Sequence, residues 1–212
     1  MIKKDTQGVT FAKGFTAAGV KAGIKKSGNL DVAVIYTKTQ AVVAGTFTQN
    51  KVAAAPVYVS KEVVATGTAH AIVANAGCAN ACTGQQGLDD AHKMAQIAAD
   101  ELGVNADDVI VGSTGVIGVS LPMDKLEAGI KDAVANLSAD GSGNAGRAII
   151  TTDTHSKSVT CEFELSGKTV RMGAIAKGSG MIRPNMATML CYITTDIALS
   201  LIHISEPTRP LY

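Results

Sequence analysis

The sequence has no tryptophan, and aromatic residues make up only 4% of its 212 residues. A protein that stacks nucleic-acid bases needs aromatic side chains, and one that tracks a phosphate backbone needs an excess of positive charge. The formal net charge is +1, so neither kind of nucleic-acid surface is expected. No apolar run reaches the roughly 18 residues of a membrane span, and the first residues lack the apolar core of a signal peptide. We therefore expect a cytoplasmic protein without a nucleic-acid or membrane partner.

Cysteine is also scarce, and its four positions are scattered: Cys78, Cys82, Cys161 and Cys191. The first two lie in one Gly/Ala-rich stretch, but no further Cys or His pair stands nearby to complete the four ligands of a zinc site. We predict reduced thiols in packed positions, with metal binding as the less favoured alternative. No metal and no cofactor is expected for the function.

Hydrophobic residues make up 46% of the chain, which allows a sizeable core. No internal repeat or linker divides residues 1–200. Apolar residues recur at three- and four-residue spacing over 88–102 and 122–136, which predicts two helices, with a shorter one at 145–150. Strands and helices alternate along the chain, so we expect an α+β or α/β layered sandwich, with helices on the outer faces of the sheets.

The strand predictions follow from β-branched runs and from alternation of apolar and polar residues. Residues 31–36 and 41–47 are predicted to form an antiparallel pair, and 158–165 with 168–176 a hairpin with a two-residue turn. Further strands are expected at 56–60, 70–75, 108–113 and 189–193. The Gly- and Lys-rich residues 1–29 are typical of loop and turn.

The most informative stretch is 177–190, where three glycine or proline stops precede Thr188 and an apolar strand. If the Thr188 hydroxyl attacked the carbonyl of Ala187, the peptide would become an ester, and its hydrolysis would free the α-amine of Thr188. Such an amine has a pKa near 7.7–8.0 in model compounds and can act as the base for its own hydroxyl. The spacing alone, however, favours an ordinary strand threonine with a satisfied hydroxyl.

Two other hydroxyl-rich stretches are candidates for the same site. The strand at 108–113 runs into Thr114 and Gly115, and such a strand end presents donors of the kind that an oxyanion hole requires. The run 151–154, Thr-Thr-Asp-Thr, offers hydroxyls for a substrate. Both stretches also have the composition of ordinary turns. The residues alone do not decide between a functional site and a turn.

Longer blocks of sequence resemble a known family. The core Ala-Lys-Gly-Ser-Gly-Met and Pro-Asn-Met-Ala-Thr-Met-Leu, within and just before 177–195, is similar to the self-cleavage segment of the ornithine acetyltransferase family, the bifunctional glutamate N-acetyltransferases. Similar blocks occur in that family's order at 13–25, 44–56, 75–87, 113–118 and 151–154. The resemblance extends to about Ser200.

The resemblance implies a reaction and roles for particular residues. It implies acetyl transfer from N2-acetylornithine to glutamate in arginine biosynthesis, through an acetyl-Thr188 intermediate, after self-cleavage between Ala187 and Thr188. Thr114 and Gly115 would stabilise the oxyanion, and Thr154 and Lys177 would contact substrate together with Thr188. Some members also use acetyl-CoA as the acetyl donor, which the sequence leaves open.

The resemblance also implies an organisation of the chain. The implied fold is a sandwich of sheets flanked by helices, which resembles N-terminal-nucleophile hydrolases in chemistry more than in topology. Residues 1–187 would form an α subunit and 188–200 the opening of a β subunit, in a heterotetramer of two α and two β subunits. Residues 201–212 depart from the family pattern and are predicted to be a non-native tail. Two alternatives remain: a self-processing aminopeptidase or amidase, and an inactive truncated fragment.

Overall fold

The computed structural model describes residues 2–4, 7–178, 180–181 and 185–199. The strands are β1 (Ile2–Lys4), β2 (Phe15–Val20), β3 (Val32–Val42), β4 (Thr68–Cys78), β5 (Val109–Val116), β6 (Lys157–Leu165), β7 (Lys168–Lys177) and β8 (Leu190–Thr195). The helices are α1 (Ala55–Thr66), α2 (Gly84–Leu102), α3 (Met123–Ala135) and α4 (Ser142–Ala148), with 3₁₀ turns η1 (Gly8–Thr10) and η2 (Ala106–Asp108).

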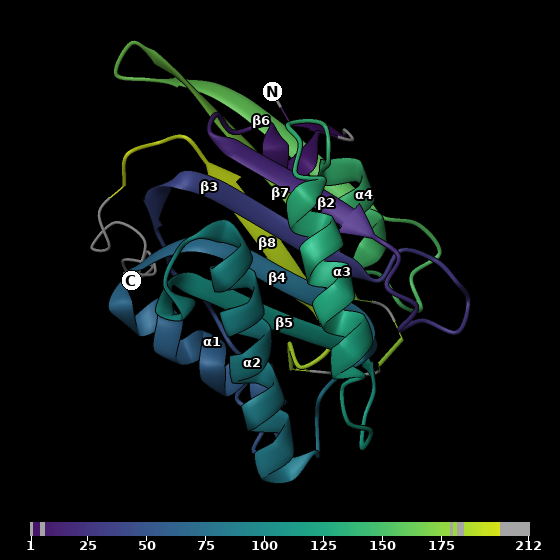
Figure 1. The fold of residues 1–212 in the computed structure, drawn as a ribbon. Coiled ribbons are helices and arrows are strands. Elements are labelled where there is room, and N and C mark those ends of the chain that lie inside the picture. Colours follow the sequence, from purple (N-terminus) through teal and green to yellow (C-terminus); the bar gives the residue numbers. More distant parts are fainter. Residues whose placement is uncertain (1, 5–6, 179, 182–184, 200–212) are drawn as a thin grey trace, which may run out of the picture.

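These elements form three layers. One sheet has the order β2-β3-β4-β5, antiparallel except for the parallel pair β4–β5, and the other is the antiparallel sheet β1-β6-β7-β8. Helices α1, α2 and α3 lie over one face of the first sheet (Figure 1). The second sheet packs against its other face, so the first sheet is the middle layer.

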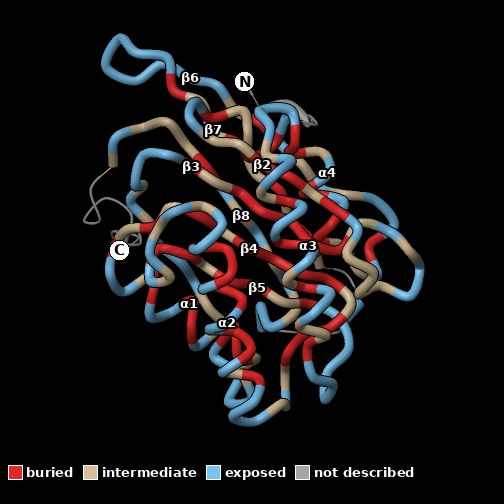
Figure 2. Tube along the Cα trace, viewed as in Figure 1, coloured by how far each residue is buried: buried red, intermediate tan, exposed pale blue. Residues whose placement is uncertain are grey.

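A separate apolar core lies on each face of the middle sheet. Side chains from α2 and α3, among them Met94 and Leu126, pack with Val34 on one face. On the other face, Ile35 packs with Ile175 of β7 and with residues of α4. Consecutive residues of a strand point to opposite faces, and a strand covered on both faces is therefore apolar at every position. Figure 2 shows the buried residues concentrated along these strands and the helix faces that meet them.

The outer face of the second sheet is apolar and exposed among the described residues. Val159 and Ile193 lie on either side of Ala174 in the strand register, and their exposed fractions are 45% and 60%. Phe163 and Leu165 of β6 are also exposed.

Several predicted elements are confirmed. The two long helices, the short helix and the hairpin at 158–176 all form, and the predicted strands at 70–75, 108–113 and 189–193 correspond to β4, β5 and β8. Gly103 ends α2 with a left-handed φ of 68°. The layered α/β fold class is confirmed as well.

Three predictions are wrong. Residues 56–60 begin helix α1, because Pro56 stands at the start of a helix whose buried face faces the sheet. Residues 31–47 do not form a pair of strands: one long strand, β3, continues through the polar residues 37–40 with a shift of register. Residues 1–29 are not all loop, since β2 pairs with β3 and packs against α4. The packing requires glycine at position 19, because a Cβ there would lie 2.2 Å from the carbonyl oxygen of Asn144.

Other expectations are answered only in part. All four cysteines are free thiols; Cys78 is buried, but Cys82 and Cys191 are exposed, so the prediction that all are packed is wrong for these two. Within the described segments, no helix is long and apolar enough to cross a membrane. The predicted non-native tail at 201–212 lies outside the described residues.

Candidate active site

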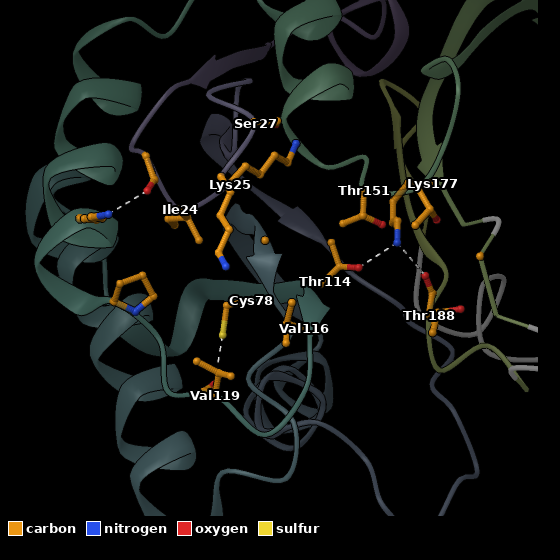
Figure 3. Close-up of a pocket in the computed structure, with 18 of the residues that line it drawn as sticks. Ile24, Lys25, Ser27, Cys78, Thr114, Val116, Val119, Thr151, Lys177 and Thr188 are labelled. Carbon is orange, nitrogen blue, oxygen red and sulfur yellow. Dashed lines mark hydrogen bonds between the residues drawn. The ribbon is translucent and has the colours of Figure 1, made fainter.

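A cavity of about 1170 Å³ opens where the ends of four strands meet. Gly77 and Cys78 at the end of β4, Thr114 at the end of β5, and Lys177 at the end of β7 line it together with Thr188, which precedes β8. The chain therefore brings together residues more than 100 positions apart, and Figure 3 shows Thr114, Lys177 and Thr188 on one side of the cavity.

Lys177 connects the other two residues. Its side chain is buried, with 3% exposed, and its ammonium donates to the Thr114 hydroxyl at 2.8 Å and to the Thr188 carbonyl at 3.1 Å. Burial lowers the pKa of Lys177, while the nearby carboxylate of Asp153 acts in the opposite direction. The ammonium thus holds two segments of the site at a fixed separation.

This arrangement leaves the Thr114 proton available. An ammonium only donates hydrogen bonds, so the Thr114 oxygen acts as acceptor toward Lys177 and its own O–H can point elsewhere. A hydroxyl polarised in this way is a suitable donor to an oxygen that gains negative charge. The neighbouring Gly115 has a φ of 137°, and a Cβ there would lie 2.4 Å from the Gly77 carbonyl carbon. Glycine is required because β4 and β5 approach so closely.

Thr188 lies in a strained turn. The amide of Met189 donates to the carbonyl of Met186 at 3.2 Å, so Ala187 and Thr188 are the two central residues of this turn. Asn185 and Met186 before it have φ values of 45° and 65°. The left-handed region costs a residue with a side chain about 1–2 kcal/mol. The turn that carries the bond between Ala187 and Thr188 therefore follows two left-handed residues, of which Met186 is the less usual in that conformation.

A buried threonine holds this turn from outside. Thr48 donates to the carbonyl of Asn185 at 2.7 Å and accepts the amide of Asn50 at 3.1 Å. Sequence reasoning missed this contact, since 137 residues separate Thr48 from Asn185. The only available signal was the family-like block at 44–56, which carried no assigned role.

The structure does not place Thr154 in the cavity. Its side chain is exposed, and its hydroxyl lies 3.0 Å from the ring of His155. Thr151 and Thr152 of the same motif line the cavity instead. Two residues of the motif therefore lie at the cavity, but Thr154, the residue chosen within it, does not line it.

Asp153 was also missed, and it supports the site from behind. Its side chain is fully buried; it accepts the Gly178 amide at 3.0 Å and pairs with Lys157. Burial alone would raise the pKa of Asp153, but the hydrogen bonds from Lys157 and Gly178 hold it below its usual value. A buried carboxylate therefore fixes the residue that follows Lys177.

The opposite wall of the cavity is the loop Gly23–Ser27 (Figure 3). The buried carboxylate of Asp31 accepts the amides of Ala22 and Ile24 at 2.6 Å and of Lys25 at 2.9 Å. Sequence reasoning placed this stretch in a Gly- and Lys-rich loop and assigned it no function. Its ordering depends on one aspartate that stands at the start of the next strand.

Comparisons with known proteins show the family of this chain. The model of the ArgJ family matches residues 16–208. An arginine biosynthesis bifunctional protein ArgJ from Symbiobacterium thermophilum is 50% identical over 204 residues, which are 95% of this chain and 51% of the relative. The ArgJ protein of Streptomyces coelicolor is 52% identical over 193 residues, 90% of this chain and 49% of the relative.

Two solved structures have the same fold. The ArgJ protein of Bacillus halodurans superimposes with a TM-score of 0.80 at 39% identity, over 90% of this chain and 98% of that one. The ornithine acetyltransferase of Mycobacterium tuberculosis, solved with ornithine, gives 0.81 at 41% identity, over 90% of this chain and 100% of that one. The chain spans about half the length of the curated relatives it matches. On the family match and these identities, the chain belongs to the ArgJ family.

Proposed function

We propose that this chain is the first half of an ornithine acetyltransferase whose nucleophile is Thr188. The protein with both halves would move an acetyl group from N2-acetylornithine to glutamate in arginine biosynthesis, in the cytoplasm, and without a cofactor. The observation that carries the proposal is the Lys177 ammonium, which joins the Thr114 hydroxyl to the Thr188 carbonyl inside one cavity. The names of the relatives supply the reaction class.

The first step in this proposal is self-cleavage. The Thr188 oxygen attacks the Ala187 carbonyl, the peptide nitrogen leaves as an amine, and water then hydrolyses the ester to a carboxylate at Ala187. The left-handed conformations of Asn185 and Met186 raise the energy of the uncut turn and so favour this step. The solved relatives are matched over 98% and 100% of their chains, but the curated sequences over about half of theirs. Crystallised chains of about this length are what cleavage in this region would produce, and they support the proposal.

The second step is acetyl transfer by double displacement. The freed amine of Thr188 takes the hydroxyl proton, the oxygen attacks the acetyl carbonyl, and ornithine leaves with its α-amine reprotonated. The amine of glutamate then attacks the acetyl-Thr188 ester and restores the hydroxyl. Thr114 and Gly115 would stabilise the oxyanion in both halves of the reaction, and ping-pong kinetics would result. Acetyl-CoA enters as an alternative donor to the same hydroxyl.

Thr154 and Lys177 remain proposed substrate contacts, with Thr151 and Thr152 better placed in the cavity than Thr154. The proposed assembly is a heterotetramer of two first halves and two second halves.

A competing activity is that of an aminopeptidase or amidase, in which water, and not glutamate, takes the acyl group from Thr188. Acetyl release that requires glutamate supports transfer, and equal release without glutamate supports hydrolysis.

The decisive experiment uses a protein that carries both halves. Intact mass spectrometry should find two polypeptides, the second beginning at Thr188, without added protease. Thr188→Ala should remain one chain, because no hydroxyl is left to accept the acyl group. Thr188→Ser should still be cut, but more slowly, since the hydroxyl remains and the methyl that restricts its rotamer is gone. An uncut wild-type protein with normal acetyl transfer would refute the free-amine base.

A further inference from the structure

The cavity has a second end that the chemistry at Thr188 does not use. Four of its twenty lining residues are lysines, namely Lys25, Lys26, Lys125 and Lys177, and none of the twenty is Asp or Glu. Hydroxyl side chains make up most of the remaining polar lining. A concave wall with several cations and no lining carboxylate concentrates positive potential inside it.

The lysines are divided between two places. Lys177 lies beside Thr188, whereas Lys25 and Lys26 belong to the loop Gly23–Ser27 on the opposite side (Figure 3). Lys125 extends from the first turn of α3 and donates to the Gly23 carbonyl at 3.0 Å, so it belongs to the loop side as well. We call this side, residues 23–27 with Lys125, the loop end of the cavity.

The loop end is built before any ligand arrives. Asp31 accepts the backbone amides of Ala22, just before the loop, and of Ile24 and Lys25 within it. The Lys25 ammonium donates to the carbonyls of Leu30 and Ala148. A Cβ at Gly77 would lie 3.0 Å from the Ile24 side chain, so the end of β4 packs directly under the loop. An ordered loop loses little freedom on binding, which favours a specific contact.

The cations of this cavity are only partly compensated. Burial lowers the pKa of Lys25, and the charge of Lys177 lowers it further, although Asp31 acts in the opposite direction. The Asp31 carboxylate is itself fully buried and occupied by backbone amides. Lys26 and Lys125 are exposed, and their charges remain available to a ligand in the cavity.

We propose that the loop end is a subsite for an anionic group, a carboxylate or a phosphate, carried by a substrate whose reacting atoms lie at Thr188. The inference rests on the proposed function in one respect, the position of the reacting atoms. Lys26 and Lys125 supply exposed positive charges, and Asp31 orders the backbone of the loop beside them. The same charges repel the side-chain ammonium of an ornithine-type ligand.

Two substrates of the proposed reaction carry such a group in addition to the α-carboxylate that N2-acetylornithine and glutamate share. The side-chain carboxylate of the glutamate acceptor is one source, and the phosphates of an acyl-CoA donor are the other. The cavity of about 1170 Å³ exceeds the 300–1,000 Å³ usual for a drug-sized ligand, so its volume admits either. The two sources differ in which Michaelis constant depends on the lysines.

The kinetic test uses Lys26→Gln, Lys125→Gln and the double variant in a protein with both halves. Exposed ion pairs contribute modestly, so the double variant should raise KM for glutamate or for acetyl-CoA by about three- to tenfold. The maximal rate and the KM for N2-acetylornithine should stay within about twofold. Lys131→Gln is the matched control, because Lys131 lies on the same helix and pairs with Glu127 away from the cavity lining. Unchanged KM values for both anionic substrates would overturn the proposal.

A binding test works without any activity. Pyrophosphate is titrated into the 212-residue chain while backbone amide signals are followed by NMR. Saturable shifts at residues 23–27 are expected in the wild type and in Lys131→Gln, and weaker binding in the double variant. Equal binding in all three would overturn the subsite. Saturable, lysine-dependent binding in a protein that transfers no acetyl group would uphold the subsite and refute the proposed function.

Discussion

At the scale of single residues, the site depends on which atoms donate and which accept. Lys177 satisfies Thr114 as a donor, and so directs the Thr114 proton away from itself. Asp153 behind it accepts the amide of Gly178 and offsets part of the burial cost of the Lys177 charge. Each of these contacts can be removed by one substitution with a defined chemical loss.

The first prediction concerns Thr114. In the two-half protein, Thr114→Ala should slow acetyl transfer by about 10²–10³, the usual effect of removing one oxyanion donor. The free energy of unfolding should fall by only about 1 kcal/mol, the typical value of one hydrogen bond. Steady-state kinetics and thermal melts check both. Thr46→Ala, at an exposed threonine, is the control; if turnover in Thr114→Ala were close to that of the control, Thr114 would not belong to the site.

The second prediction concerns Asp153 and pH. The folded-state pKa of Asp153 lies below its unfolded value, so its contribution to stability is fully present above about pH 4 and is lost as pH falls through the folded pKa. Asp153→Asn should lower the free energy of unfolding at pH 7 by about 1.5–3 kcal/mol, the range for hydrogen bonds to a charged group.

Thermal melts between pH 7 and pH 2 test the assignment of this effect to the charge. The difference between wild type and Asp153→Asn should shrink as the wild-type carboxylate becomes protonated. Asp124→Asn, at an exposed aspartate in α3, should show no such pH-dependent difference. If the difference in melting temperature between wild type and Asp153→Asn stayed constant down to pH 2, the loss of stability would be due to the changed shape of the side chain and not to its charge.

Sequence reasoning selected three residues that line the cavity, but not the residues that hold them in place. Thr114, Lys177 and Thr188 stand in distinctive local contexts, at strand ends or after glycine and proline. Thr48 and Asp153 look like ordinary turn residues, because their function lies in contacts 137 and 25 residues away. Such contacts depend on how the sheets pack, which no local pattern encodes.

At the scale of elements, the parallel pair β4–β5 positions the site, and α1 protects its free edge. Ser60 of α1 is buried; it donates to the Val111 carbonyl at 2.6 Å and accepts the Val111 amide at 3.0 Å. β5 is the last strand of its sheet, so these two backbone groups would otherwise lack a partner on that side. The helix thus closes the edge of the strand that ends at Thr114.

The third prediction follows from this contact. Ser60→Ala leaves a buried donor and a buried acceptor without a partner, and each costs about 1–3 kcal/mol. The melting temperature should fall by several degrees, as a chain of about 200 residues loses roughly 2–4 °C per kcal/mol. Differential scanning calorimetry measures the change, with Glu62→Ala on the exposed face of α1 as control. Equal melting temperatures for the two variants would contradict the edge-protecting role.

Helix α1 also illustrates a limit of local sequence patterns. Residues 56–60, Pro-Val-Tyr-Val-Ser, favour a strand by composition. The segment is helical because Val59, Ser60 and Val63 recur at helical spacing on the face buried against β5 and the neighbouring helices. Tertiary burial outweighs a preference that spans only about 1 kcal/mol. The long helices α2 and α3 were predictable, since their apolar spacing extends over several turns.

At the scale of the whole molecule, the two sheets differ in how far their faces are covered. The middle sheet is covered on both faces, but the outer face of β6, β7 and β8 exposes Val159, Phe163 and Ile193. Contiguous exposed apolar surface of this kind marks an interaction site in a folded protein. β8 follows directly on the turn at Thr188, and the curated relatives carry about as much chain again as this chain spans.

The last prediction is that the second half of such a protein packs on this face. Burial of an isoleucine side chain is worth about 1.5–3 kcal/mol, and a buried lysine without a partner adds a further cost. In the cleaved two-half protein, Ile193→Lys should therefore weaken the association of the halves at least about tenfold, measured by sedimentation velocity over a dilution series. Tyr58→Lys is the control, because Tyr58 is 45% exposed on α1, in the opposite outer layer.

The comparison separates packing on this sheet from a general effect of added charge. Both variants gain one positive charge on an exposed apolar residue, so any loss caused by net charge alone would appear in both. Weaker association in Ile193→Lys only would locate the contact on the outer face of β8. Equal association in Ile193→Lys and wild type would mean that the second half binds elsewhere, and that the open apolar face of β6, β7 and β8 is covered by something other than the partner formed by cleavage at Thr188.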